Sequence, residues 1–506
     1  MLLIPFLLLL SSLLLIIKKL ATKKGKLPPS PPKLPLLGNL HQLGAFPHRS
    51  TWELSKKYGP IMLLRLGSTP TIFVSSAETA KEILKTNDLE CCSRPPLTGP
   101  KRLSYNFQDV AFVPYGHHYR EMRKICVTEL FSMKKVQSFQ SVRKEEIDLL
   151  IKSISESATL ANPVDLSKGI LSLTAGITFR IAFGKSFRGS QLDNDNKLQK
   201  LVSEASTMLG SFCASDFFPY VGNVIDWFTG FHRRLENTFH QLDVVFQQII
   251  DDHLKSGTTM REHHQEDMVD VLLRMVKDQS ENGAIHLNKD RIKALLLDIF
   301  VAGIDTSAIA IIWAMTELAR KPTAMKKAQD EIRSCDGNKG KLTENDVSQL
   351  KYLKMIIKET LRLHPPGPLL LPRETASHLK IGDYDIYPKT RIAVNVWATG
   401  RDPDIWNNPE EFIPERFEDS VIDLKGQHFE LLPFGAGRRI CPGMNMGMAV
   451  LELALANLLY FFDWKVPSGM EIDMEERVTI SLGKKTALML VPIKYNIGED
   501  DEIMHC

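Results

Sequence analysis

The chain is poor in cysteine and gives its cysteines no shared spacing. Its 506 residues include seven cysteines, an odd number with no C-x-x-C pair. This pattern argues against a disulfide framework and against a zinc site. The sequence also lacks an Asn-x-Ser/Thr glycosylation acceptor. Both absences are consistent with a reducing, cytosolic environment.

Other absences narrow the function. No G-x-G-x-x-G fingerprint follows a strand-like segment, so the chain shows no nicotinamide-binding domain of its own. The formal net charge is only +3, and residues 1–26 hold five lysines without an acidic residue. The rest of the chain has 58 basic and 60 acidic residues, so nucleic-acid binding has no support. No internal repeat divides the chain, which favours one large domain.

An apolar leader opens the sequence. The stretch MLLIPFLLLLSSLLLII would reach about 25 Å as a helix, enough for a thin bilayer. A cleaved secretory signal is the alternative. No basic residue precedes the run, no small-x-small cleavage site follows it, and a lysine cluster begins at Lys18. We therefore expect residues 1–17 to be an uncleaved, single-pass transmembrane anchor, with everything after it in the cytosol.

Behind the leader, the sequence predicts a linker and one domain. Residues 18–38 are basic and proline-rich, which favours a stiff polyproline II segment, although an ordinary spacer fits the composition equally well. Residues 39–506 are predicted to form a mainly α domain with small β-sheets. Helical periodicity marks residues 136–154, 233–254 and 350–363, a strand pair is expected at 61–75, and extended segments at 378–396 and 478–493.

The longest apolar pattern in this domain runs from Asn288 to Pro322. As a second membrane span it would bury Asp298 and Asp305, each costing about 2.5–3.5 kcal/mol near a helix centre. We therefore predict a buried central helix, with Asn288 as its N-cap and Pro322 at its end.

One cysteine stands in an unusual setting, the stretch PFGAGRRICPG that contains Cys441. A thiolate is favoured by backbone N–H donors, nearby cations and a helix N-terminus. Glycines permit a close backbone approach, Arg438 and Arg439 are expected to bring positive charge, and an apolar helix begins beyond Pro442. A nucleophile paired with a base and an axial metal ligand both fit such a thiolate. Flat, glycine-rich surroundings favour haem, whose propionates would explain the arginines.

The spacing Phe434-x-x-Gly437-x-Arg439-x-Cys441-x-Gly443 resembles the haem-thiolate loop of the cytochrome P-450 family. The stretches LLGNLHQLG, SDFFPYVG and GRDPDIWNNPEEFIPERF extend the resemblance over essentially the whole chain. Together they resemble the plant A-type, membrane-bound branch of the family. The resemblance implies the cytochrome P-450 fold, a haem whose iron takes the Cys441 thiolate, and a monooxygenase that uses O₂.

The same resemblance implies a structural cluster behind the haem loop. Glu359 and Arg362 match the family's Glu-x-x-Arg, and Arg416 would complete a Glu-Arg-Arg network. Glu317 and Arg320 match the short motif as well, but only the first pair is followed by KETLRLHPPGPLLLPRE and by EFIPERF downstream. We interpret this cluster as stabilising the fold.

On the central helix, AGIDTS resembles the family's oxygen-activation motif. Thr306 can donate to the carbonyl of Ala302 at i−4, and Gly303 leaves room for a small ligand, which predicts a groove for dioxygen. The resemblance implies that Asp305 and Thr306 organise the water chain that delivers protons.

On the propionate side, the chain departs from the family pattern. Tyr119 stands where the family usually has tryptophan, one helical turn before Arg123, and a phenol can replace the indole as a donor. By resemblance, Arg94, Arg373 and Arg439 are further propionate contacts. His117 and His118 are expected to be solvated rather than iron ligands.

The substrate is expected to be a hydrophobic small molecule of plant specialised metabolism, with terpenoids favoured and phenolic or alkaloid skeletons next. The resemblance points to a pocket lined by Phe212, Ile299, Val301, Ala302, Leu369, Leu370 and Leu482. The aromatic segment 217–231 either dips into the bilayer or packs internally, and its composition fits both.

Electrons must come from a partner. The resemblance implies an NADPH-cytochrome reductase in the endoplasmic reticulum membrane, docking on the cysteine side of the haem, where Arg438 and Lys124 are candidate contacts. Two alternatives share the cysteine loop: a haem-thiolate isomerase or dehydratase, and a non-catalytic haem-binding protein. The presence of Asp305 and Thr306 weighs against the first.

Overall fold

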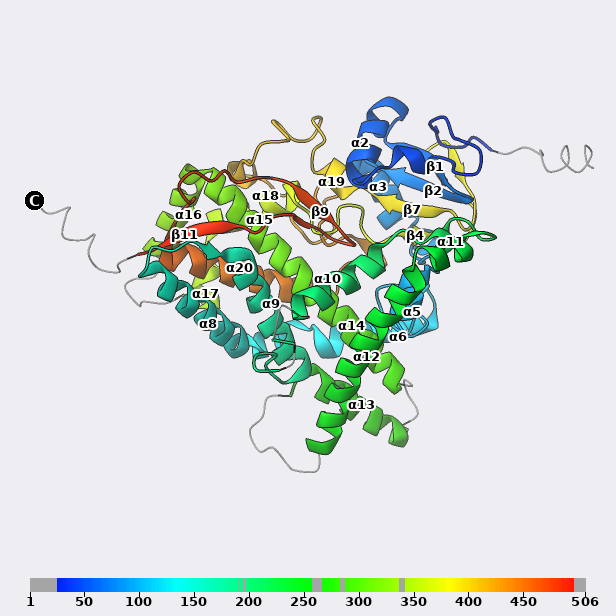
Figure 1. Cartoon of the computed structure of the whole chain (residues 1–506). Helices are drawn as coiled ribbons and strands as arrows, with labels where there is room; N and C mark the ends of the chain where they lie inside the picture. The colour runs from blue at the N-terminus through cyan, green and yellow to red at the C-terminus, as the bar shows by residue number, and fades with distance from the viewer. Residues whose placement is uncertain are drawn as a thin grey trace, which may run out of the picture.

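A computed structural model of the chain confirms a mainly α protein with small sheets (Figure 1). The structure describes residues 25–495 except 191, 194–196, 257–265, 283–286 and 336–341. The predicted anchor, residues 1–17, lies outside the described residues.

The predicted central helix is present. It consists of α14 (Lys289–Val301), a π-type turn at Ala302–Thr306 and α15 (Ser307–Arg320). Asn288 caps its start, because Oδ1 accepts the backbone N–H of Arg291 at 2.9 Å. The helix ends at Arg320, and Pro322 is already the first residue of α16 (Pro322–Ser334), where its missing N–H costs nothing.

Three described helices are long and apolar enough to cross a membrane: Leu166–Phe183, Lys289–Arg320 and Met444–Phe461. Between 56% and 67% of their most apolar windows is buried inside the protein, so here these helices build the core. The first is α9 and the last is α20, and both pack against α15.

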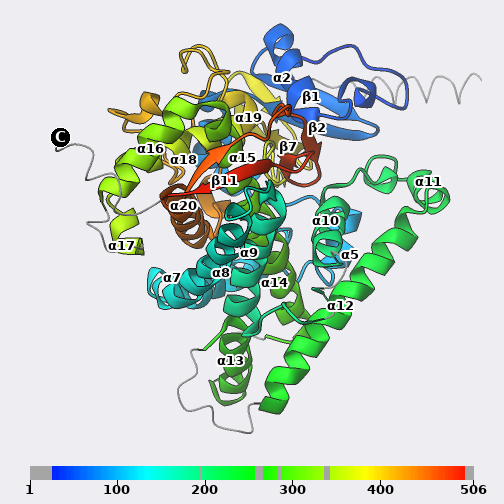
Figure 2. The same ribbon diagram turned by 60° about the vertical axis from the view of Figure 1, so that its left-hand side comes forward.

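Shorter and more amphipathic helices surround this core, with α12 running along one edge of the molecule to α13 (Figure 2). They are α2 (Pro47–Tyr58), α3 (Ala77–Lys81), α4 (Asp88–Cys91), α5 (Thr98–Leu103), α6 (His117–Ile125), α7 (Met133–Ser138), α8 (Gln140–Ala158), α10 (Lys197–Gly210), α11 (Gly222–Phe228), α12 (Phe231–Ser256), α13 (Met268–Asn282), α17 (Glu344–Val347), α18 (Lys351–Leu363) and α19 (Val396–Thr399). The predicted segments 136–154, 233–254 and 350–363 fall in α7 with α8, in α12 and in α18.

The largest sheet lies at the opposite end of the molecule from α13 (Figures 1 and 2). Its first two strands are the predicted pair, β1 (Ile61–Leu66) and β2 (Thr69–Val74), antiparallel with Ile61 opposite Val74. β2 pairs in parallel with β7 (Arg391–Val394), which pairs with β4 (Arg373–Glu374), so the strand order is β1-β2-β7-β4.

The remaining sheets are small. One has the order β3-β11-β8, and two are hairpins, β5-β6 and β9-β10. Their bounds are β3 (Val164–Asp165), β5 (Leu379–Ile381), β6 (Tyr384–Ile386), β8 (Phe462–Lys465), β9 (Glu476–Val478), β10 (Leu482–Lys484) and β11 (Met489–Lys494). The β9-β10 hairpin packs on α15, which places its turn beside the central helix.

The described part of the proline-rich linker lies on the domain. The carbonyl of Pro29 accepts the N–H of Leu63 in β1 at 2.9 Å, and that of Lys26 accepts the N–H of Asp385 in β6 at 2.8 Å. The side chain of Asn39 donates to the carbonyls of Pro31 and Pro32. This segment therefore packs on the domain at the end that carries the largest sheet.

Candidate active site

Cys441 lies in the loop that leads into α20, two residues after a short 3₁₀ turn at Gly437–Arg439. Its N–H donates to the carbonyl of Phe434 at 3.0 Å, which closes the loop. Gly437 has φ +68°, and a Cβ there would lie 2.3 Å from the carbonyl oxygen of Leu84. Only glycine fits at this position, because a side chain would meet fixed backbone.

The electrostatic setting of Cys441 differs from the sequence expectation. Burial raises the pKa of its thiol, and within the described part of the chain the backbone N–H of Gly443 and the charge of Arg123 oppose this effect. Arg438 instead pairs with Asp88 at 3.0 Å. Arg439 donates to backbone carbonyls. The prediction that these two arginines bring positive charge to the sulfur is therefore wrong, because the loop turns both side chains away.

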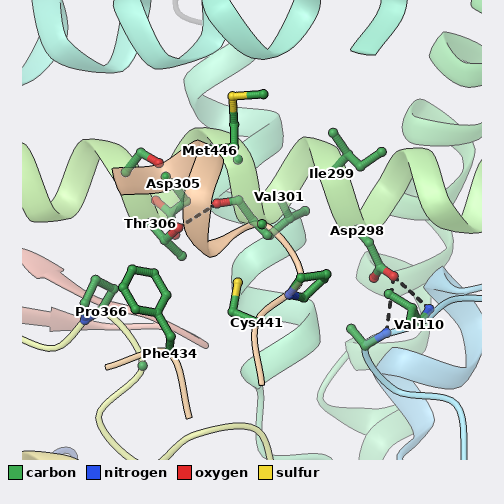
Figure 3. Close-up of a pocket in the computed structure, with 18 of the residues that line it drawn as sticks. Val110, Asp298, Ile299, Val301, Asp305, Thr306, Pro366, Phe434, Cys441 and Met446 are labelled. Atoms are coloured by element: carbon green, nitrogen blue, oxygen red, sulfur yellow. Dashed lines mark hydrogen bonds between the residues drawn. The ribbon is translucent and has the colours of Figure 1, made fainter. Parts of the chain in front are cut away.

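A cavity of about 390 Å³ lies between Cys441 and the central helix. In Figure 3 the sulfur faces Val301 and Thr306 across this space. Fourteen predicted site residues line it: Arg94, Tyr119, Arg123, Ile299, Val301, Ala302, Asp305, Thr306, Leu370, Arg373, Phe434, Arg439, Cys441 and Gly443. The volume is in the range of pockets that hold small organic molecules.

Four predicted site residues do not line this cavity. Gly437 packs against Leu84 and Asp88. Phe212, beyond the end of α10, is 53% exposed and stacks on Phe217, with ring centroids 4.5 Å apart. Leu369 packs with the hydrophobic side chains of β1 and β2. Leu482 is buried in β10, where its carbonyl accepts the indole N–H of Trp313.

One wall of the cavity carries three neighbouring guanidinium groups, those of Arg94, Arg373 and Arg439. All three line the cavity, and among the described residues only Arg373 of the three has a carboxylate partner, Asp88 at 2.8 Å. The other two donate to backbone carbonyls, those of Cys92, Val110, Ala111, Val113, Leu371 and Pro372.

Burial lowers the pKa values of two of these arginines, Arg439 and Arg94, and neighbouring positive charge adds to the effect. Burial lowers the pKa of Arg439 to about 10. Burial and the charges of Arg439 and Arg373 lower the pKa of Arg94 as well. Arg123 lines the cavity and makes no side-chain hydrogen bond within the described part of the chain. A group that presents carboxylates here would relieve this repulsion, so the wall fits the propionate edge of haem.

Tyr119 and His118 lie on α6, beside this wall. The hydroxyl of Tyr119 donates to the carbonyl of Arg438. Its ring also lies under the guanidinium of Arg439, 3.7 Å from that group. His118 is half-buried and burial lowers its pKa, so the expectation of a solvated residue holds only for the exposed His117.

The π-type turn of the central helix opens toward the cavity. Thr306 Oγ1 donates to the carbonyl of Ala302 at 2.7 Å, as its position predicts. Both side chains are exposed to the cavity, whereas a Cβ on Gly303 would press to 3.0 Å from Thr178 Oγ1 on α9. The extra residue in the turn displaces the helix ladder at the point opposite Cys441.

Asp305 faces a different direction from Thr306. Its carboxylate is buried and accepts hydrogen bonds from the hydroxyl groups of Ser206 and Ser481. Burial raises the pKa of Asp305, while Ser481, the charge of Arg477 and Ser206 oppose the rise.

A second buried carboxyl group fixes the loop at one end of the cavity. Asp298 Oδ2 accepts the N–H groups of Val110 at 2.9 Å and Ala111 at 3.2 Å, as Figure 3 shows for the labelled Val110. Burial and the charge of Asp109 raise the pKa of Asp298, and burial raises the pKa of Asp109 to about 7.

Behind the cysteine loop, Glu359, Arg362 and Arg416 form one cluster. Arg362 donates two hydrogen bonds to Glu359, at 2.7 and 2.8 Å, and Arg416 donates a third at 3.0 Å. The side chains of Glu359 and Arg362 are fully buried. Arg320 of the competing motif is 46% exposed, and its partner Glu317 is bound to His364.

Comparisons with known proteins match this geometry. The family model "Cytochrome P450" matches residues 28–491. Cytochrome P450 71B20 of Arabidopsis thaliana is 54% identical over 491 residues, which is 96% of this chain and 97% of that protein. The chain belongs to the cytochrome P450 family. Cytochrome P450 71B19 of the same plant is 53% identical over 97% of this chain and 98% of its own length, so this P450 falls in the plant A-type branch.

A solved structure supports the fold of this P450. A zebra fish cytochrome P450, determined with abiraterone, superposes with a TM-score of 0.75 and 24% identity, covering 90% of this chain and all of that one. At this identity the likeness shows the fold alone.

Membership of the family establishes the cofactor of this P450. It is a haem-thiolate monooxygenase whose haem iron takes the thiolate of Cys441. Burial disfavours the free thiolate, so the haem iron itself would supply the stabilisation that Cys441 needs to bind as a thiolate. The glycine-rich loop thus needs no nearby arginine to make Cys441 a ligand.

Sequence reasoning did not find the residues that hold Asp305. Ser206 and Ser481 are ordinary serines in their local sequence, 99 and 176 positions from Asp305. Their helix and hairpin meet the central helix only in the folded protein. The only available signal was that a buried aspartate needs donors, which does not say where they come from.

Proposed function

We propose that this P450 oxidises a hydrophobic plant specialised metabolite, with a terpenoid as the first candidate and a phenolic or alkaloid skeleton next. The observation that carries this is the wall of the cavity opposite Cys441. Ile299 and Val301 of the central helix supply apolar surface there, Leu370 and Phe434 add apolar lining on the cysteine side, and Ala302 and Thr306 leave open space above the sulfur. A substrate held by such a wall is selected by shape and apolar area.

We propose distinct roles for the residues around this space. When bound, haem with a cysteine ligand activates dioxygen for oxidation of a C–H bond. Thr306 keeps a polar hydroxyl beside the widened helix turn, where it can hold a water molecule and pass a proton at Oγ1. Asp305 supplies protons to this point from the outer side of the helix. The apolar wall limits how many other water molecules enter, which favours proton use in the reaction over its loss.

The cationic wall has a holding function in this proposal. Arg94, Arg123, Arg373 and Arg439 would bind the two propionates, and Tyr119 would support them through the cation–π contact with Arg439. The glycines of the cysteine loop would let the porphyrin face lie close to the backbone. The Glu359 cluster supports the loop from behind and takes no part in the chemistry.

Electrons are proposed to arrive from an NADPH-cytochrome reductase on the cysteine side. Lys124 is exposed on α6, and the side chain of Arg438 is 47% exposed next to the cysteine loop. An acidic face of a flavoprotein would meet these charges first, and its association rate would fall with added salt.

The endoplasmic reticulum membrane is the proposed location. Six large apolar side chains on and before α11 are exposed: Tyr220, Val221, Val224, Ile225, Trp227 and Phe228. Exposed Leu36 and Leu37 of the linker lie nearby, because the β1-β2 turn bonds to both Leu37 and Phe217. We call this set the α11 patch. Its position beside the end of the chain that carries the predicted anchor supports contact with the bilayer.

The decisive experiment uses the full chain in membranes with reductase, NADPH, ¹⁸O₂ and a panel of terpenoids, phenolics and alkaloids. We expect one labelled oxygen atom in the product and dependence on reductase. Conversion without reductase would indicate an isomerase or dehydratase, and no conversion of any compound would leave only haem binding.

A further inference from the structure

Two serines from separate elements hold the carboxylate of Asp305. Ser206 lies on α10, and Ser481 lies in the turn between β9 and β10. Ser481 Oγ donates to Oδ2 of Asp305 at 2.5 Å, and Ser206 Oγ donates to the same oxygen at 3.2 Å. Ser206 is 1% exposed and Ser481 4%, so bulk water does not compete for these bonds.

The hairpin turn is fixed independently of Asp305. The N–H of Ile480 donates to the carbonyl of Ser206 at 3.2 Å, and that of Leu482 donates to the carbonyl of Pro366 at 2.8 Å. A Cβ on Gly210 would lie 2.5 Å from the nitrogen of Ile480, so α10 and the turn are in close contact. The contacts of the turn with α10 and with Pro366 therefore hold Ser481 next to the carboxylate of Asp305.

The two hydroxyl groups change what the carboxylate can do. A buried carboxyl group without donors stays protonated and rotates to any available acceptor. Ser481 and Ser206 stabilise its ionised form and direct one oxygen toward the hairpin. Arg477 is the charged group that acts on Asp305, and its guanidinium donates to Ser203 Oγ at 3.1 Å.

We propose that Ser481, assisted by Ser206, is a positioning residue for proton delivery: it holds the Asp305 carboxylate in the orientation from which this side chain passes protons to the Thr306 side of the cavity. The inference rests on the roles proposed above for Asp305 and Thr306. In each proton transfer, of which one turnover needs two, Asp305 takes one proton from water and gives one to water held at Thr306 Oγ1, so the carboxylate returns to its starting state. The serines keep their own protons.

The first test measures coupling in the full-length holoenzyme with reductase. For Ser481→Ala we expect product per NADPH to fall about tenfold, the loss of one hydrogen bond to a charged acceptor, with peroxide rising correspondingly. Ser206→Ala should have a smaller effect, because its bond is longer. Thr306→Ala serves as the positive control for uncoupling.

Two matched variants separate positioning from packing. Ser481→Thr keeps the hydroxyl and should restore coupling. Thr207→Ala removes a hydroxyl from α10 that donates to the carbonyl of Ser203 at 2.7 Å, and it should behave as wild type. Coupling in Ser481→Ala equal to that of Thr207→Ala would overturn the proposal, as would a failure of Ser481→Thr to restore it.

The second test needs no turnover. Infrared spectra of the holoenzyme, with Asp305→Asn to assign the band, follow the carbonyl stretch of protonated Asp305 as a function of pH. In Ser481→Ala this band should persist to higher pH, because the donor that favours the carboxylate is gone. An unchanged titration overturns the inference. If wild type forms no labelled product, the proposed function fails, whereas this titration still decides whether Ser481 acts on Asp305.

Discussion

At the scale of single residues, the surroundings of Cys441 show how one sulfur atom is prepared as a ligand. Its thiol has a raised pKa and lies in a glycine-rich loop, whereas the five other cysteines in the described part of the chain lie outside this loop. Cys91 and Cys126 are buried, and burial raises the pKa of each to about 12. Selectivity for the metal therefore comes from access and geometry, since low thiol pKa values are absent among these three groups.

The first prediction concerns this ligand. Cys441→Ser should remove the red-shifted absorption band of the reduced, CO-bound protein, because a serine hydroxyl does not replace the thiolate. Cys335→Ser, at an exposed position at the end of α16, should keep the band in full. Retention of the band in Cys441→Ser would show that another residue binds the iron.

The sequence pattern located the residues of the site better than it described their surroundings. Cys441, Thr306 and the arginines carry recognisable spacings, because each motif lies within one turn or one loop. The orientation of Arg438 and Arg439 depends on Asp88 and on the loop at 110–113, which are distant in sequence. Local spacing therefore could not predict it.

At the scale of elements, the Glu-x-x-Arg motif occurs on two helices, and its surroundings differ between them. In α18, Arg362 is fully buried and bonds to Glu359 and to the carbonyls of Gly400, Pro409 and Glu411. In α15, Arg320 meets Glu317 at 3.3 Å near solvent. A buried charge that loses its partner is costly, whereas an exposed pair contributes little.

Stability should follow this difference. We expect Arg362→Ala to lower the free energy of unfolding by about 3–5 kcal/mol, because Glu359 is left buried and lacks its main partner. Arg320→Ala should cost less than about 1 kcal/mol. Thermal or denaturant unfolding of the two holoproteins measures the contrast, and equal losses would contradict it.

A histidine joins two other elements, α12 and α13. His253 Nε2 lies 2.9 Å from Asp267 and 4.0 Å from Asp270, and Nδ1 lies 2.7 Å from the carbonyl of Ile249. Burial alone lowers the pKa of His253, but the hydrogen bond and charge of Asp267 outweigh this and raise it overall. The protonated imidazole therefore stabilises the folded state.

The His253–Asp267 pair makes the stability of the folded protein depend on pH. Because the folded pKa lies above the unfolded value, the contribution of His253 is complete below about pH 6.5 and is lost as the pH rises through the folded pKa. The stability difference between wild type and His253→Gln should accordingly shrink at alkaline pH. His240→Gln, at an exposed histidine on the same helix, is the control, and parallel curves of stability against pH for the two variants would contradict a stabilising His253–Asp267 pair.

At the scale of the whole molecule, the described part of the chain keeps its catalytic cavity and its exposed apolar surface apart. The cavity lies under the central helix, whereas the α11 patch lies beside the β1-β2 turn and the linker. The segment 217–231, for which the sequence left bilayer contact and internal packing open, places six large apolar side chains outward. Only Gly222 and Asp226 of α11 are buried.

Membrane contact of this patch can be measured on the full chain in vesicles. Trp227 is 69% exposed, and quenchers on the lipid chains should reduce its fluorescence. Trp227→Phe should lose most of the lipid-quenched signal, whereas Trp464→Phe, in buried β8, should retain it. Quenching that does not depend on Trp227 would place the patch away from the bilayer.

The sequence by itself determined the helical class, the central helix with its cap, the cysteine loop and the family, because these depend on periodicity and on motifs a few residues long. Only the tertiary structure decided which side chains meet in space. Examples are the serines that hold Asp305, the three arginines on one wall of the cavity, and Phe212, which is exposed instead of lining the cavity. These contacts join residues far apart in the chain, and they arise when packing of the apolar faces brings separate elements together, which no local pattern records.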